Sequence, residues 1–433
     1  MALPPPGIQP EQNRPVAIRG DIGKIPSKVN LELFDIGVFT KDKIREIFRG
    51  GKLPTADAMV EEIILRAVKE GATDIHIEPD EGELRIRLGD EGILRRLVSL
   101  PKEISENIAS VVKQKANLNQ FEKKKAQEGR CSMTFAGNQI DIRVATLPTI
   151  TGERIALRLF NRTEDISRIE ELGFSPENLE RIRKILQQPS GLILAVGSSG
   201  MGMSTIIFAC LNALQSPEKN IITLENPVEF KLNFSSQVQA VLDKSVTPTD
   251  TLRPILRQSP NVLMLSEIRD GETGSIAAEA ALAGSLVLST IVATDSLGTI
   301  PRLLNFGLSP YWVATSLTGL VYQKLIRKVC ENCKEEYQPT DEEISRLGSS
   351  EFASFFKGKG CDQCNKTGYH GRTGIHEILI IDDRLRDLIY RGASILDLKQ
   401  SAYASGFEDI RADAGKKVVA GITTIEELVR SLG

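Results

Sequence analysis

Short apolar runs alternate with stretches of helical spacing over the second half of the chain, and this pattern predicts a parallel sheet covered by helices. Each apolar run is followed at once by polar residues. In an open α/β sheet, the carboxyl ends of the parallel strands line the crevice that binds ligands. The pattern therefore predicts an α/β domain over residues 191–433, with strands at 192–196, 221–224, 262–265 and 286–290.

A smaller pattern occupies residues 55–160. It begins with apolar residues at helical spacing between Ala58 and Ala67, after Asp57 near the helix start. Segments that alternate like strands follow, and turns rich in Gly, Asp and Glu separate them. We therefore expect a second compact α/β domain, with strands at 74–78, 83–88 and 140–145.

The remaining intervals carry weaker patterns. Residues 1–54 are expected to be a disordered arm and a short linker, because the first part is proline-rich, polar and aperiodic. Residues 161–190 are expected to link the two domains. Helical periodicity punctuated by glycine predicts small helices over residues 380–433.

Composition limits the kinds of partner. A chain of 433 residues, 41% of them hydrophobic, can bury the cores of several domains. The net charge of −3 and the pI near 5.9 leave no electrostatic footprint for nucleic acid, and the basic run at 123–125 is typical of a solvated face. No apolar stretch approaches the roughly 20 residues that span a bilayer, and no secretory leader is apparent. We expect a cytoplasmic protein that touches membranes only through partners.

The first predicted strand of the larger domain runs into a glycine-rich turn that should open a helix. The spacing of its glycines, serine and threonine is that of a P-loop, where backbone N–H groups and a helix N-terminus cradle a phosphate. The position of the P-loop lysine is occupied by Met203. Taken alone, the turn is weak evidence, since a Gly/Ser turn after a strand is usually only a turn. The candidate phosphate-binding residues are Gly197, Ser198, Ser199, Gly200, Met201, Gly202, Met203, Ser204 and Thr205.

Six cysteines are too few for a disulfide framework in so long a chain, and four of them form two CxxC pairs. Two such knuckles separated by a loop are the usual donors of a tetrahedral structural zinc, and the alternative is four free core cysteines. A complete set of four thiolates leaves no open coordination position, so this zinc should stabilise the fold and not catalyse. The predicted ligands are Cys330, Cys333, Cys361 and Cys364, within a subdomain at 325–377, while Cys131 and Cys210 are expected to be buried.

Several segments resemble the secretion-ATPase superfamily, the motors of type II secretion and type IV pilus assembly. In the smaller domain the resemblance rests on residues 71–79, on 128–130 and on 141–153. In the larger domain it rests on an acidic box, a Walker B strand, a histidine box and a post-zinc signature. These lie at 223–230, 264–273, 284–295 and 367–377, so the resemblance covers nearly everything from Thr55 onward.

The resemblance implies a fold and a cofactor. It implies a RecA-like P-loop NTPase core, a smaller N-terminal α/β domain of PAS-like type and a zinc-knuckle insertion, with ATP or ADP and Mg²⁺ as ligands. Glu267 stands where the family places the activator of the attacking water, and Glu225 matches the first glutamate of the acidic box. Arginine forks suit phosphate, although surface ion pairs are the commoner use, which makes candidates of Arg130, Arg143 and Arg158.

Six polar positions of the presumed site depart from the family pattern, and they are spread over four boxes. Methionine replaces the P-loop lysine, asparagine replaces the aspartate of the acidic box, and two histidines of the histidine box are lost. The fourth box, residues 252–261, resembles a family segment from which two aspartates are lost. Losing the lysine at Met203 removes a charge-assisted contact worth roughly 1.5 to 3 kcal/mol. These losses favour a degenerate motor that still binds nucleotide, over the alternative of an active ATPase that powers assembly. A zinc-knuckle module for nucleic acid is disfavoured by the acidic pI. The six positions are Met203, Asn226, Ser259, Asn261, Ser285 and Val292.

The resemblance also implies partners. We expect a ring oligomer, a hexamer, formed by this chain alone or with an active paralogue. It would dock on the cytoplasmic side of an inner-membrane platform protein, and nucleic acid is not an expected partner.

Overall fold

The computed structural model of the protein describes residues 55–433, except 91–92, 136–137, 162–167, 199, 227, 229, 240–247, 341, 344–354 and 365. The expected disordered arm at 1–54 and the candidate residue Ser199 lie outside the described residues.

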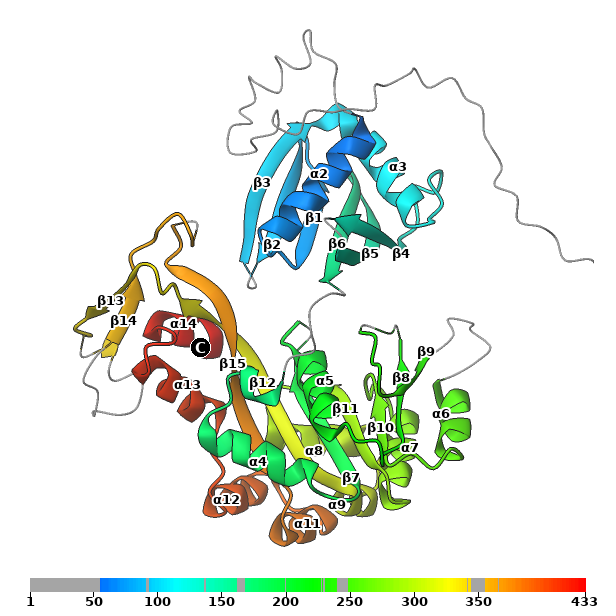
Figure 1. Ribbon diagram of the computed structural model, residues 1–433, viewed down its shortest axis with the longest axis vertical. Coiled ribbons are helices and arrows are strands. Elements are labelled where there is room, and N and C mark those ends of the chain that lie inside the picture. The colour runs from blue at the N-terminus through cyan, green and yellow to red at the C-terminus, as the bar shows by residue number, and fades with distance from the viewer. Residues whose placement is uncertain are drawn as a thin grey trace, which may run out of the picture. The chain divides into compact units, whose positions relative to one another are not determined.

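The N-terminal domain is a six-stranded antiparallel sheet with two helices, in the strand order β3-β2-β1-β6-β5-β4 (Figure 1). Its first helix, α2 (Ala56–Lys69), is capped by the side chain of Thr55 and buries the predicted apolar stripe. The three predicted strands are confirmed as β1, β2 and β5, and β3, β4 and β6 were not predicted. The other elements are β1 (Asp74–Pro79), β2 (Glu83–Asp90), β3 (Ile93–Pro101), η3 (Lys102–Ile104), α3 (Ser105–Lys115), β4 (Gln127–Phe135), β5 (Asn138–Thr149) and β6 (Gly152–Asn161).

The second sheet has seven strands in the order β15-β12-β7-β11-β10-β8-β9. All neighbours pair in parallel except β12 and β15. The four predicted strands are confirmed. The strands are β7 (Gly191–Gly197), β8 (Ile221–Glu225), β9 (Ser236–Gln239), β10 (Val262–Leu265), β11 (Leu286–Val292), β12 (Leu317–Val329) and β15 (Tyr369–Ile380).

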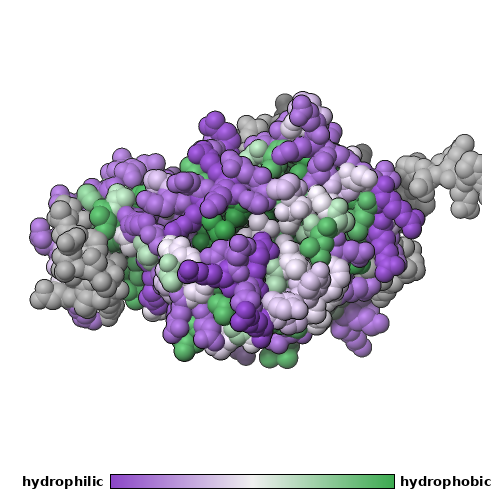
Figure 2. All heavy atoms as spheres, turned by 90° about the horizontal axis from the view of Figure 1, so that it is seen from below, coloured by the Kyte–Doolittle hydropathy of each residue, from purple (hydrophilic) through white to green (hydrophobic). Residues whose placement is uncertain are grey.

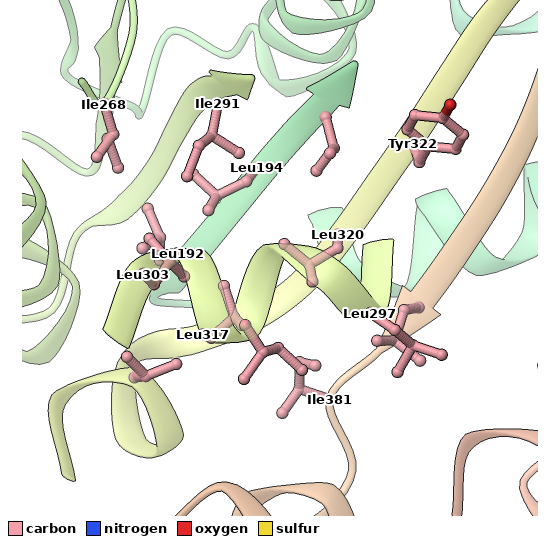
Figure 3. Close-up of a cluster of buried hydrophobic side chains, with 14 of the residues drawn as sticks. Leu192, Leu194, Ile268, Ile291, Leu297, Leu303, Leu317, Leu320, Tyr322 and Ile381 are labelled. Carbon is pink, nitrogen blue, oxygen red and sulfur yellow. The ribbon is translucent and has the colours of Figure 1, made fainter. Parts of the chain in front are cut away.

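Helices cover both faces of this sheet, which explains why its central strands β7, β10 and β11 are predominantly apolar runs. Leu192 and Leu194 of β7 face one cluster, whereas Ile193 and Ala195 face another. Figure 3 shows the first cluster, in which Leu297 and other side chains of α8 gather against β7 and β12. The helices are α4 (Pro176–Leu186), α5 (Met203–Leu214), α6 (Pro248–Leu256), α7 (Gly271–Leu282), α8 (Ser296–Asn305) and α9 (Pro310–Ser316).

The interval expected to be a linker contains more structure than predicted. A short turn, η4 (Ile169–Glu171), precedes α4, which begins after the capping side chain of Ser175. Ile182 and Ile185 of α4 are buried in the second apolar cluster with β7 and α5. The range 168–190 is therefore part of the second domain, because the amphipathic face of α4 has a core to pack against.

Among the described residues after β12, the chain carries a two-stranded sheet and, over residues 383–432, four helices, in agreement with the helical pattern of the tail. The sheet pairs β13 (Lys334–Tyr337) with β14 (Phe355–Gly358). Each helix starts at a side-chain cap. The helices are α11 (Asp383–Tyr390), α12 (Ile395–Ala404), α13 (Ile410–Val419) and α14 (Ile425–Leu432).

Over the described part of the chain, none of the helices combines the length and the apolar character needed to cross a membrane. The face drawn in Figure 2 is largely hydrophilic, and its hydrophobic residues form small separate groups. This view offers no broad apolar band.

Glu427 at the start of α14 is a buried carboxylate that holds the tail to β12. It accepts hydrogen bonds from the Arg327 guanidinium at 2.7 Å and from Arg430 at 2.5 Å. Burial raises the pKa of Glu427, but the hydrogen bonds from Arg430 and Arg327 outweigh it, so this pKa lies below its usual value. A lowered pKa in the folded state contributes stability above the unfolded pKa, and that contribution is lost as the pH falls through the folded pKa.

We expect Glu427→Ala to lower the free energy of unfolding by about 3 kcal/mol, because it leaves Arg327 buried without its partner. The effect should shrink in acid, where the carboxylate of the unmodified protein is itself protonated. Denaturant unfolding at pH 7.5 and at low pH measures this. The exposed neighbour Glu426 is the control, and Glu426→Ala should change stability by less than about 0.5 kcal/mol. Equal losses for the two variants would contradict the prediction.

Candidate nucleotide site and metal centre

The glycine-rich loop joins β7 to α5 at the carboxyl end of a central strand. Gly200 and Gly202 both have positive φ, 83° and 79°, which lets the chain curl without a steric penalty. The first helical hydrogen bond of α5 runs from the Ile206 amide to the Gly202 carbonyl. The amides of Met203, Ser204 and Thr205 therefore have no partner within the helix and form an anion-binding N-terminus.

Met203 has a packing role at the start of α5. Its side chain is partly buried and packs against the apolar cluster shared by α4, α5 and β7. A Cβ added to Gly197 would lie 3.5 Å from its Cγ, so the side chain lies against the end of the strand. At the position where a P-loop carries lysine, Met203 thus supplies apolar packing contacts and no positive charge.

Both candidate carboxylates lie at the same edge of the sheet as the loop. Glu225 ends β8 and is almost fully buried, where it accepts hydrogen bonds from Thr223 Oγ1 at 2.7 Å and Gln237 Nε2 at 2.9 Å. Glu267 follows β10, is 24% exposed, and pairs with the Arg269 Nε at 2.7 Å. Glu267 is therefore the accessible carboxylate of the two, and Glu225 is held by its neighbours.

The three candidate arginines form a row across the N-terminal sheet. Arg130 of β4 is opposite Arg143 of β5, which is opposite Arg158 of β6. Directly opposed residues share a face of the sheet. Glu128 pairs with Arg143 and Asp74 pairs with Arg158, each at 3.0 Å. Desolvation, followed by the charge of Arg143, lowers the pKa of Arg130.

This row presents three exposed guanidinium groups on one surface, with two carboxylates paired to them. It is therefore suited to an anion such as a phosphate. His76, on β1 of the same sheet, has a pKa lowered first by burial and then by Arg154, which agrees with a structural role.

The four paired cysteines meet at one point. The sulfur atoms of Cys330, Cys333, Cys361 and Cys364 all lie within 4.8 Å of one another, and the shorter separations are 3.7, 3.8 and 3.9 Å. Four thiolates about 2.3 Å from a tetrahedral zinc are about 3.8 Å apart, so the donor set fits this ion. Cys210 is buried as predicted, whereas Cys131 is only partly buried.

Hydrogen bonds around the sulfurs support the same interpretation. The amides of Gly360 and Gly368 donate to the sulfurs of Cys333 and Cys364, each at 3.3 Å, and the Asn332 amide group donates to Cys361 at 3.4 Å. Such donors orient and stabilise thiolates around a metal. A Cβ at Gly368 would lie 2.5 Å from a backbone oxygen, so only glycine fits this close turn.

The sequence profile of the type II/IV secretion system proteins matches residues 52–430. The chain belongs to this family. Over 378 residues it is 40% identical to the type IV pilus assembly ATPase PilB of Thermus thermophilus, which covers 86% of this chain and 42% of that protein. Over 372 residues it is 39% identical to the type II secretion system protein E of Dickeya dadantii, covering 86% of this chain and 74% of that protein.

Solved structures show the same fold. The ATPase DotB of Legionella pneumophila aligns with a TM-score of 0.64 at 18% identity, over 88% of this chain and 97% of that chain. The pilus retraction motor PilT with bound ADP aligns with a TM-score of 0.59 at 22% identity, over 85% and 95%. The predicted α/β fold with a RecA-like core is confirmed.

The departures from the family pattern of the type II/IV secretion system proteins divide into two groups. Met203, Asn226 and Val292 lie at the carboxyl edge of the sheet, and Val292 is paired directly with Gly197 at the start of the loop. The prediction that the other three also belong to this site is wrong. Ser259, Asn261 and Ser285 precede β10 and β11 at the opposite edge.

Ser285 has a structural partner there. Its hydroxyl donates to the Pro260 carbonyl at 2.7 Å, and Leu286 beside it pairs with Gly191, the first residue of β7. Val292 ends β11 seven residues after Ser285, so the two are roughly 23 Å apart at about 3.3 Å per residue. The histidine box, residues 284–295, therefore begins at the amino-terminal edge of the sheet and ends at its carboxyl edge.

A pocket of about 980 Å³ opens at this amino-terminal edge. Arg183, Lys219 and Asn261 are among its lining residues. Since the phosphate loop lies at the other end of the same strands, this pocket is separate from the candidate nucleotide site.

Proposed function

We propose that the chain is a ring subunit of a type II secretion or type IV pilus assembly machine that binds ATP or ADP with Mg²⁺ and hydrolyses ATP slowly or not at all. One observation carries the proposal: the loop keeps its glycines and its helix start, while Met203 packs against the core. Backbone donors and the Ser204 hydroxyl remain for phosphate and Mg²⁺. Position 203 has no lysine to balance the negative charge that spreads over the transferring phosphoryl group.

The alternative is an active ATPase that powers assembly. It is supported by Glu267, which stays accessible at the carboxyl edge and bears the carboxylate needed to activate water. The names of the PilB and secretion relatives also favour it. The chain spans 42% of PilB, so the assembly ATPase activity named for PilB is ascribed to this chain only as a proposal.

A calorimetric titration with MgATP and MgADP, run beside a steady-state phosphate-release assay, separates the two functions. We expect saturable binding near one nucleotide per chain and phosphate release close to the buffer background. Glu267→Gln should leave the binding unchanged, because Glu267 is assigned to water activation and not to phosphate contact. Robust phosphate release that disappears in Glu267→Gln would overturn the proposal and establish the active motor.

The proposal includes partners. The subunit works in a hexameric ring, alone or with an active paralogue, on the cytoplasmic side of an inner-membrane platform protein. The arginine row on the N-terminal domain supports a nucleotide site shared between domains. Light scattering at high concentration, with and without nucleotide and paralogue, tests the ring. A strictly monomeric species under all these conditions would count against it.

Four-cysteine zinc coordination is also part of the proposed function, in a structural role. The sulfur geometry and its hydrogen-bond donors support it. The phosphate loop lies beside the middle of β12, where Tyr322 pairs with Val196, whereas the proposed zinc ligand Cys330 follows the carboxyl end of β12.

A further inference from the structure

A glutamine from β12 fills the space beneath the phosphate loop. Gln323 is buried, and its Nε2 donates a hydrogen bond of 2.6 Å to the carbonyl oxygen of Met201. A Cβ at Gly202 would lie 2.5 Å from this Nε2, and a Cβ at Gly197 would lie 3.0 Å from the Gln323 carbonyl. The two loop glycines thus leave room for Gln323 as well as for a phosphate.

His376 on β15 sets the orientation of this amide. The two residues are paired in register, and the His376 Nε2 lies 2.7 Å from the Gln323 Oε1. Burial, followed by the charge of Lys417, holds the pKa of His376 well below its usual value, so the ring is neutral. Only the tautomer with a proton on Nε2 donates to Oε1 while leaving Nε2 of the glutamine to face Met201.

The histidine is itself fixed by two helices. Asp413 of α13 accepts the His376 backbone N–H at 2.9 Å and pairs with Lys417 at 2.5 Å. Asn178 of α4 donates to the His376 carbonyl at 3.3 Å. The Phe174 ring lies against the imidazole, with centroids 3.9 Å apart. A buried polar chain therefore runs from α13 to the loop.

We infer that Gln323 is a positioning residue of the phosphate loop, acting on the backbone through Met201. In a trans peptide the carbonyl and the following N–H point in opposite directions. By holding the Met201 carbonyl inward, Gln323 turns the Gly202 N–H outward, toward the space where a phosphate binds. With methionine at position 203, such backbone N–H donors contribute a larger share of the phosphate affinity than they do in a loop with the lysine. This inference rests on the proposed nucleotide function.

Gln323→Met keeps the size of the side chain and removes both the Nε2 donor to Met201 and the Oε1 acceptor from His376. Lys324→Met is the matched control, because Lys324 is the next residue of β12 and also loses one bond to a backbone carbonyl, that of Ser431. We expect amide hydrogen exchange of the full-length, nucleotide-free protein to speed up about tenfold over residues 198–205 in Gln323→Met only. The dissociation constant of MgADP should rise about tenfold in the same variant.

Unchanged loop exchange in Gln323→Met, relative to Lys324→Met, would overturn the inference. If the unmodified protein binds no nucleotide, the proposed function fails, yet the loop exchange still decides the role of Gln323.

Gln323→Glu adds a pH readout that a purely structural role would not produce. The carboxylate still accepts from His376 but opposes the Met201 carbonyl, and protonation restores an O–H donor. Around this position the titratable groups are His376 on β15 and, behind it, Asp413 and Lys417 on α13. We expect the loss of MgADP affinity, relative to the unmodified protein, to be large at pH 8 and smaller at pH 6. The same relative loss at both values would count against the inference.

Discussion

Replacing Met203 with lysine is expected to tighten the binding of MgATP by roughly 10- to 100-fold and to recover little ATP turnover. A charge-assisted contact to phosphate contributes roughly 1.5 to 3 kcal/mol, which corresponds to this range. The lysine stem can follow the path of the partly buried Met203 while its ammonium reaches the loop. Turnover stays low because Asn226 and Val292 still stand at the same edge of the sheet.

The triple change Met203→Lys, Asn226→Asp and Val292→His should recover more turnover than the sum of its single changes. Groups that act together on one transition state are non-additive. Val292 is paired with Gly197, so a histidine there would stand beside the loop. Steady-state phosphate release at saturating MgATP measures the gain, and MgATP titration separates it from the gain in binding.

The opposite edge of the sheet provides a matched control. Ser259→Asp with Asn261→Asp also restores two family residues, both at exposed positions beside β10. Because these residues lie at the amino ends of the strands, the double change should leave binding and turnover as they were. A gain in turnover from the control equal to that from the triple change would refute the division of the departures between the two edges.

The strands that were predicted from the sequence are those whose pattern is local. Leu192 to Val196 form a continuous apolar run because both faces of β7 are covered, and such a run is visible without the fold. β12 and β15 escaped prediction because charged residues interrupt their apolar positions, such as Lys324 and Arg327 of β12 and Arg372 and Glu377 of β15. They pair across an intervening zinc-binding segment, and Gln323 meets His376 over 53 residues of sequence.

The candidate site was predictable as a set of residue types, but its geometry was not. The loop was found from its glycine spacing after an apolar run, and Glu225 and Glu267 were found from the resemblance to the family. Parallel strands then bring the carboxyl ends that carry them together. The sequence could not show that the histidine box begins at the opposite edge, so Ser285 was wrongly included. Nor did any pattern indicate that Gln237 holds Glu225 or that Gln323 reaches the loop, since these are long-range side-chain contacts.

Removing the zinc is expected to destabilise the second domain without removing nucleotide binding. Purified without chelator, the protein should contain about one zinc per chain, and Cys361→Ser should abolish most of it, because Cys361 is one of four sulfurs within 4.8 Å. Structural zinc binds with roughly 10 to 16 kcal/mol. If about 4 kcal/mol of this is lost from folding, the thermal midpoint falls by roughly 8 to 16 °C.

Nucleotide binding should survive because the zinc ligands lie far from the loop along β12. Tyr322 is the last β12 residue paired with β7, and Cys330 comes eight residues later, or roughly 26 Å at about 3.3 Å per residue. Elemental analysis, thermal unfolding and MgADP titration of Cys361→Ser measure the three effects. Cys131→Ser is the control, since this partly buried cysteine lies on β4 of the N-terminal domain and outside the cluster. Zinc-free protein with an unchanged midpoint would exclude a structural metal, and loss of MgADP binding at a temperature where Cys361→Ser is folded would contradict the separation of the two sites.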